Sequence, residues 1–161
     1  MNLLERVQIP LATPLESWKD FYYMKSQLHT TEHILFTTLM KKFSLKTKAM
    51  ELRDDFCRVA YESDTDLRKF KSELENSVNE VIKKNLSVKS YVIDRSEASN
   101  IVGLELVPKN AQKIDVSEII GFNKLACVGP HVDNTSKIGK FNIIKISKKG
   151  KNCYSIKFIV K

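Results

Sequence analysis

The chain has 161 residues, a formal net charge of +8 at pH 7, 42% hydrophobic residues and 29% charged residues. A domain of this size buries a full hydrophobic core, so neither a disulfide nor a metal is required for folding alone. Because no run of about 18 apolar residues is present, we expect no membrane-spanning helix. The charged start MNLLERV and three widely spaced cysteines do not suit a secreted, disulfide-bonded protein, so we expect a cytoplasmic location.

The first predicted element is a helix near the N-terminus. Thr13 and Pro14 are typical of an N-cap and the first helical position, and Glu16 completes a capping box. This helix should run through residues 18–22. It either continues or is followed by a second helix over residues 26 to about 43, where apolar side chains recur at steps of three and four residues.

The next stretch predicts a β-hairpin and then a long amphipathic helix. Residues 47–63 have the pattern of two strands, with a turn at residues 53–55. Apolar residues at helical spacing follow, and we expect Asp64 or Thr65 to cap the helix that they form. These apolar residues are Leu67, Phe70, Leu74, Val78, Val81 and Ile82.

The remainder of the chain predicts strands. Residues 87–94 and 112–121 each favour a strand, and residues 95–103 between them favour a helical turn or two. The alternation over residues 140–161 predicts a β-hairpin with Gly150 in its turn. The fold class is therefore α+β, a twisted, mainly antiparallel sheet packed against helices.

The three histidines of the chain and one of its cysteines occur in two short blocks. His29 and His33 lie four residues apart on a predicted helix, so their side chains point the same way from adjacent turns. Some zinc enzymes use this spacing, although a histidine pair on a helix is also common as a plain polar face.

The second block, Cys127 and His131, also spans four residues. Gly129 and Pro130 between them oppose a helix and predict a strand end followed by a tight turn. A thiolate and an imidazole would then face one point, and with the helical pair they give three nitrogens and one sulfur, a ligand set that suits zinc. Cys57 and Cys153 lie in apolar strand patterns and are predicted to be core thiols.

Positive charge is concentrated at the C-terminal end. Residues 131–161 contain eight lysines and one acidic residue. A basic face of this kind attracts a polyanion such as nucleic acid, although it is also typical of a plain solvated surface. Tyr154 is the one aromatic residue here that we expect to be exposed, so phosphate contact is favoured over base stacking. The predicted contacts are Lys137, Lys140, Lys148, Lys149 and Lys151.

Two quoted motifs carry a resemblance to a known family. The stretch HTTEHIL, followed much later by CVGPHVDNTSKIGKFNI, resembles the editing domain that alanyl- and threonyl-tRNA synthetases share with freestanding AlaX-type trans-editing proteins. The segments LENSVNEVIKKNLSV and IGKFNIIKISKKGKNCYSIKF are similar to a helix and the closing hairpin of that family. We therefore expect one editing-type domain over residues 1–161, with residues 1–25 as an N-terminal helical extension and residues 26–161 as the core.

The resemblance implies a function and a set of site residues. His29, His33, Cys127 and His131 would be the zinc-site residues. Thr30 matches a serine or threonine of the family that lies near the aminoacyl group and helps to sense its size. We therefore assign Thr30, together with His29 and His33, to the catalytic group. Asp133 and Asn134 either orient His131 by a hydrogen bond or form a turn. Glu32 is expected either to contact the metal ligands without binding the metal itself or to face solvent.

The implied reaction is hydrolysis of the ester between a wrong amino acid and the 3' end of a tRNA. Zinc could lower the pKa of a water molecule or hold the amino group of the substrate. Seryl- or glycyl-tRNA(Ala) is the first expected substrate. Seryl-tRNA(Thr) stays open because Pro130 is the residue of threonyl-type domains. A zinc-stabilised RNA-binding module without activity and a zinc hydrolase of another ester or amide are the other readings, since four protein ligands describe a closed site.

Overall fold

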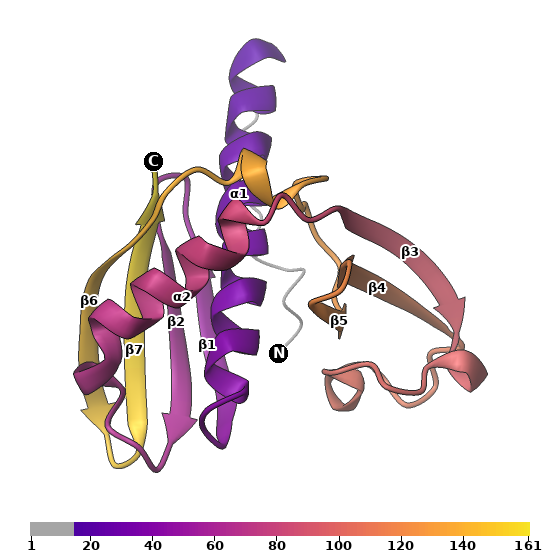
Figure 1. Ribbon diagram of the computed structural model, residues 1–161. Coiled ribbons are helices and arrows are strands. Elements are labelled where there is room, and N and C mark those ends of the chain that lie inside the picture. The colour runs from indigo at the N-terminus through magenta and orange to yellow at the C-terminus, as the bar shows by residue number, and fades with distance from the viewer. Residues whose placement is uncertain (1–14) are drawn as a thin grey trace.

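The computed structural model describes residues 15–161, and the side chains from Tyr22 onwards. Two helices and seven strands follow one another in this part of the chain, with short 3-10 turns between them (Figure 1). The predicted cap at Thr13 and Pro14 lies outside the described residues, as does the side chain of Glu16. Neither helix of residues 15–161 combines the length and the apolar character needed to span a membrane.

Helix α1 (Leu15–Met40) is one continuous helix of 26 residues. The alternative of a separate helix starting near residue 26 is therefore wrong. After Met40 the chain makes a closing turn, in which the Phe43 amide donates to the Leu39 carbonyl at 2.8 Å. The buried face of α1 is formed by Leu28, Ile34, Leu35 and Leu39. The N-terminal part of α1 extends beyond the sheets (Figure 1).

The larger sheet has four antiparallel strands in the order β1-β2-β7-β6. Strands β1 (Leu45–Leu52) and β2 (Cys57–Ser63) form the hairpin predicted around residues 53–55. Strands β6 (Phe141–Gly150) and β7 (Cys153–Val160) form the predicted C-terminal hairpin. The main hydrophobic core lies between this sheet and the two helices.

The second helix begins later than predicted. Asp66, rather than Asp64 or Thr65, is the cap: its carboxylate accepts from the Arg68 amide at 3.1 Å and starts the 3-10 turn η2 (Leu67–Phe70). Helix α2 (Lys71–Lys83) follows and buries the predicted face. It also protects the edge of the sheet, since the Asn79 side chain makes two 2.9 Å bonds to the backbone of Phe141 in β6.

A second, smaller sheet contains β3 (Val88–Asp94), β4 (Lys113–Ile119) and β5 (Asn123–Ala126). Its strands are antiparallel and are arranged in the order β3-β4-β5. The predicted α+β class is confirmed, but the strands form two sheets rather than one, because among residues 15–161 β3 to β5 do not pair with any strand of the larger sheet and they enclose a small core of their own. The turn predicted after β3 is the 3-10 turn η3 (Arg95–Glu97).

The C-terminal hairpin turns at a different residue from the one predicted. Gly150 is the last residue of β6 and pairs with Cys153, so the turn consists of residues 151 and 152. Asn152 takes the left-handed conformation, with φ 53°, which asparagine tolerates well in a two-residue turn. Lys148 and Lys149 therefore lie in β6.

Three expectations about burial depend on which face of its strand each side chain occupies. Cys57 is fully buried, which confirms a core thiol, whereas Cys153 is half-buried. The expectation of an exposed Tyr154 is wrong, because this residue is only 4% exposed. It lies beside Tyr61 in the register of β2 and β7, on the face that packs against the helices.

The segment that returns from the second sheet to β6 positions the candidate site. It leaves β5 at Ala126 and passes along α1 (Figure 1). Its far end is fixed where the Val88 amide donates to the Asp133 carbonyl at 2.9 Å. Residues 127–133 are therefore held between α1 and the second sheet.

Candidate metal centre

The helical half of the site lies in the middle of α1. His29 and His33 are 5% and 3% exposed, so both imidazoles are buried. Their ring centroids are 4.7 Å apart, as the spacing of one helical turn predicts. The predicted reading of this pair as one face of a helix is confirmed.

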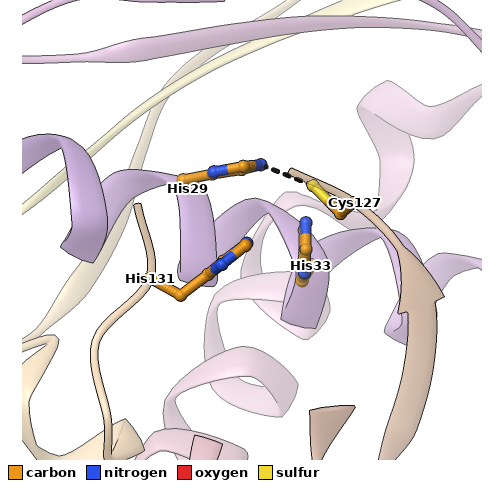
Figure 2. A group of neighbouring side chains, drawn as sticks. All are labelled: His29, His33, Cys127 and His131. Atoms are coloured by element: carbon orange, nitrogen blue, oxygen red, sulfur yellow. Dashed lines mark hydrogen bonds between the residues drawn. The ribbon is translucent and has the colours of Figure 1, made fainter. Parts of the chain in front are cut away.

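The other half comes from the segment after β5. The Cys127 amide donates to the Asp115 carbonyl at 3.0 Å, which continues the pairing with β4 for one residue past the end of β5. Gly129 and Pro130 then turn the chain, and His131 returns toward α1 (Figure 2). The predicted strand end and turn are both present.

The structure brings the four predicted ligands together (Figure 2). One ligand atom from each of His29, His33, Cys127 and His131 lies within 4.8 Å of the other three. The Cys127 Sγ atom is 3.2 Å from His29 Nε2, and the His131 ring centroid is 4.4 Å from that of His29. The cluster could hold one metal ion.

The hydrogen bonds of the imidazoles support this reading. His29 Nδ1 lies 3.2 Å from the Pro130 carbonyl, so Nδ1 carries the proton and unprotonated Nε2 accepts from the Cys127 thiol at 3.2 Å. His33 Nδ1 and both ring nitrogens of His131 are buried without a hydrogen-bond partner. Buried polar atoms are normally satisfied, and a metal ion would supply the missing partner. Three nitrogens and one sulfur therefore fit zinc.

Burial sets the protonation states of the cluster. It lowers the pKa of His29 to about 4 and that of His131 to about 3. The pKa of His33 is also well below its ordinary value, first through burial and then through the neighbouring imidazoles. All three are neutral at pH 7, which is the form that binds a metal. Burial, followed by the charges of Glu32 and Asp115, raises the pKa of Cys127 to about 12.

Gly129 is a functional position that sequence reasoning missed. A Cβ atom there would lie 2.6 Å from Cε1 and 2.8 Å from Nδ1 of His29, and the residue has φ +153°. Any side chain would therefore push the His29 ring away from its place. The signal in the sequence is the Gly-Pro pair between Cys127 and His131, which predicts a turn but not this close approach.

Thr30 is fully buried, with both hydrogen bonds of its hydroxyl in use. The hydroxyl donates to the Ser26 carbonyl at 2.8 Å and accepts from the Val132 amide at 3.1 Å. It thereby fastens the residue next to His131 onto α1. The structure thus gives Thr30 a positioning contact, and its predicted role near the aminoacyl group stays a prediction.

Glu32, Asp133 and Asn134, the other polar residues considered for the site, make structural contacts. Glu32 is buried and accepts from the Tyr61 hydroxyl at 3.0 Å, and burial raises its pKa to about 7. Asn134 caps the 3-10 turn η5 (Thr135–Lys137), and Asp133 forms an ion pair with Lys137 at 2.7 Å. Of the two readings of Asp133 and Asn134, turn formation is right and orientation of His131 is wrong, since neither bonds its ring.

The five predicted phosphate contacts are all exposed but do not form one surface. Lys137 and Lys140 precede β6, and the Lys140 backbone pairs with that of Lys161. Lys148, Lys149 and Lys151 lie at the hairpin turn, at the opposite end of β6 (Figure 1). Residues 141–147 of β6 separate the two groups by roughly 25–30 Å.

Comparison with known sequences supports the family resemblance that the two motifs carry. A sequence model of the family described as the threonyl and alanyl tRNA synthetase second additional domain matches residues 116–154. The chain is 33% identical over 149 residues to the alanine–tRNA ligase of Borreliella afzelii, which covers 88% of this chain and 24% of that protein. It is 30% identical over 151 residues to the alanyl-tRNA editing protein AlaX-M of Saccharolobus solfataricus, covering 88% and 61%.

An α+β domain with three imidazoles and a thiol around one point is thus similar in sequence to proteins of tRNA aminoacylation and editing. The chain is therefore similar to the family of the threonyl- and alanyl-tRNA synthetase second additional domain, which its motifs also resemble. It spans about a quarter of the ligase and less than two thirds of the AlaX-M protein.

Proposed function

We propose that the chain is a zinc-dependent aminoacyl-tRNA deacylase. It acts in trans on the ester that joins a wrong amino acid to the 3' end of tRNA, in the cytoplasm, with residues 26–161 as the core and residues 1–25 as an extension. Seryl-tRNA(Ala) is the first substrate, and glycyl-tRNA(Ala) is the next. The observation that carries the proposal is the convergence of four ligand atoms within 4.8 Å of one another.

The residues divide the work in the following way. His29, His33, Cys127 and His131 hold zinc. When bound, zinc supplies a Lewis acid that activates water or orients the substrate. Thr30 acts as a positioning residue, because its hydroxyl fixes the Val132 amide at 3.1 Å.

A cavity whose lining includes residues close in sequence to two of the ligands offers room for the end of the substrate. Its volume is about 290 Å³, and its lining includes Thr37 and Leu125. Thr37 lies one helical turn after His33, and Leu125 lies two residues before Cys127. Lys41 and Lys124 also line it and give it positive charge. We assign this cavity to the 3' end of the aminoacyl-tRNA, whose backbone phosphates are anionic.

Two alternatives follow from particular observations. Pro130 is the residue of threonyl-type domains, so seryl-tRNA(Thr) is the second candidate substrate. Four protein side chains around one point also suit a closed structural zinc site. The second candidate function is therefore a zinc-stabilised RNA-binding module without hydrolytic activity.

A deacylation assay tests the proposal. Seryl-tRNA(Ala), glycyl-tRNA(Ala) and seryl-tRNA(Thr) are incubated with the protein, with and without a chelator. We expect seryl-tRNA(Ala) to lose serine fastest and chelation to stop the reaction. Cys127→Ala should lower the rate by at least a factor on the order of 100, since even the loss of a hydrogen-bond partner of a metal ligand costs roughly 10- to 100-fold, whereas Cys153→Ala, at a half-buried cysteine of the hairpin, should leave it unchanged.

Each other result has a definite meaning. Survival of all three esters would overturn the deacylase and leave the RNA-binding module. Hydrolysis that is equally fast after chelation would remove the zinc dependence. Faster loss of serine from tRNA(Thr) would make the domain threonyl-type. Equal cleavage of seryl-tRNA and a simple serine ester would favour a hydrolase with another substrate.

A further inference from the structure

Four exposed lysines gather where α2 meets the 3-10 turn η5. Lys83 and Lys84 lie at the C-terminal end of α2, Lys137 ends η5, and Lys140 follows it. We propose that this surface, named here the α2–η5 lysine surface, binds the phosphate backbone of the RNA whose 3' end enters the metal centre. The inference rests on the proposed function for the identity of that RNA. It adds two lysines to the predicted contacts and excludes the hairpin turn.

Hydrogen bonds fix the two elements to each other. The Thr135 hydroxyl accepts from the Leu86 amide at 2.9 Å and donates to the Ile82 carbonyl at 3.1 Å. The Asn134 amide group donates to the Asn85 carbonyl at 3.4 Å. Because Thr135 is fully buried, the end of α2 and η5 form one rigid platform.

The platform is attached to the metal centre by the main chain of Lys137. Its carbonyl accepts from the Gln27 side chain at 2.8 Å and from the Tyr23 hydroxyl at 3.2 Å. Gln27 is two residues before His29. An RNA that delivers its 3' end to the metal centre therefore passes within reach of Lys137.

The surface has more positive than negative charge. Glu80 forms an ion pair with Lys83 at 3.2 Å, and Asp133 forms one with Lys137 at 2.7 Å. Among residues 22–161, neither Lys84 nor Lys140 has an ion-pair partner, so both are free to neutralise phosphates. Lys83 and Lys140 also line a cavity of about 440 Å³ between α2 and the start of β6, which gives a backbone phosphate room to approach.

Tyr23 adds an aromatic group on the path to the metal centre. Its side chain is held by the Lys137 carbonyl, yet the residue is 46% exposed. An unpaired base can stack on such a ring next to a basic surface. This combination of aromatic and lysine side chains is what a single-stranded 3' end following a duplex requires, and it favours RNA over another polyanion.

The hairpin turn supplies a matched control. Lys148 and Lys149 are also exposed lysines without an ion-pair partner among residues 22–161, and they lie roughly 25–30 Å away at the other end of β6. The test compares Lys84→Ala/Lys140→Ala with Lys148→Ala/Lys149→Ala in the zinc-loaded full chain. Both double variants remove the same charge.

The probe is a fluorescent RNA hairpin that carries no amino acid, copies an acceptor stem and ends in unpaired 3' nucleotides. We expect Lys84→Ala/Lys140→Ala to weaken binding about tenfold or more at low salt. The slope of log K against log salt concentration should fall by about 0.9 for each duplex phosphate that is no longer neutralised. Lys84→Arg/Lys140→Arg should restore both values, and the hairpin-turn variant should stay within about twofold of the wild type.

Deacylation distinguishes this inference from the proposed function. With seryl-tRNA(Ala), the KM of Lys84→Ala/Lys140→Ala should rise while kcat is unchanged. If the hairpin-turn variant weakens binding as much, or if the wild type does not bind the probe, the inference is overturned even where deacylation is intact. If the wild type hydrolyses no ester but only Lys84→Ala/Lys140→Ala loses RNA affinity, the surface stands and the deacylase is overturned.

Discussion

The Thr30 hydroxyl and the Val132 amide are 3.1 Å apart and join two segments that are 102 residues apart in the chain. The same hydroxyl donates to the Ser26 carbonyl at 2.8 Å. One buried side chain thus sets the distance between the helical imidazoles and the segment that carries His131. The structure therefore gives Thr30 a positioning contact between α1 and this segment.

Thr30→Val should destabilise the protein, because it leaves the buried Val132 amide without an acceptor. An unsatisfied buried donor costs about 1–3 kcal/mol, and we expect a loss of this size in the free energy of unfolding in urea. Thr30→Ser keeps the hydroxyl and should lose much less. Equal stability of Thr30→Val and the wild type would show that the bond does not hold the segment.

Gly129→Ala should weaken zinc binding. The new Cβ would lie 2.6 Å from the His29 ring, and the strain of such overpacking, about 1–3 kcal/mol, corresponds to a loss of affinity of roughly 5-fold to 150-fold. Competition with a chelating dye measures it. Gly150→Ala is the control, since a Cβ atom at that position would have nothing within 4 Å, and it should bind zinc like the wild type. Unchanged affinity in Gly129→Ala would contradict the geometry.

The stability of the metal-free protein should depend on pH through its buried histidines. The folded-state pKa values of His29 and His131, about 4 and about 3, lie below the ordinary 6.5. The unfolded chain binds protons first as the pH falls, so this stabilisation is present above pH 6.5 and is lost toward pH 4. His29 alone accounts for about 3 kcal/mol. Urea unfolding of chelated protein at pH 5 and pH 6.5 measures the change.

Glu32 should give the free energy of unfolding a pH dependence opposite to that from the histidines, with stability lost as the pH rises. Its folded-state pKa is raised to about 7 from 4.5 by burial, so its stabilisation is complete below pH 4.5 and is lost as the pH rises through 7. Glu32→Gln removes this loss. We expect its free energy of unfolding to improve relative to the wild type between pH 5 and pH 8, and a constant difference over that range would contradict a buried carboxyl.

Zinc binding at pH 7 should release about one proton per ion. The three imidazoles are already neutral, whereas the Cys127 thiol, with a pKa of about 12, must lose its proton. The affinity should therefore rise about tenfold per pH unit above pH 7. Calorimetry in buffers with different ionisation heats counts the protons, and Cys127→Ala should release none. Release of two or more protons would mean that an imidazole enters the reaction charged.

Much of the site could be predicted from the sequence because it depends on residue types that are rare in this chain. The spacing of His29 and His33 fixes their common direction on any helix, and the Gly-Pro pair fixes the turn before His131. The close approach of Gly129 and the Thr30 bond could not be predicted, because both depend on how the segment packs on α1.

The fold likewise contains features that local sequence predicts and features that depend on how distant segments pair. Local patterns predicted both helices and every strand except β5 to within a few residues, because apolar periodicity is local, whereas β5 is indicated only by the strand end near Cys127. The division into two sheets, the cap at Asp66 and the inward side of Tyr154 depend on which strands pair and in which register. The lysines looked alike in sequence, and only the length of β6 separates Lys140 from Lys149.

The most direct test of the metal centre is the zinc content of the purified protein, combined with X-ray absorption at the zinc edge. We predict one zinc ion per chain with three nitrogen ligands and one sulfur ligand, and no sulfur ligand in Cys127→Ala. A protein that binds no zinc under saturating conditions, or a zinc spectrum that is the same in the wild type and in Cys127→Ala, would contradict a zinc site shared by these four side chains.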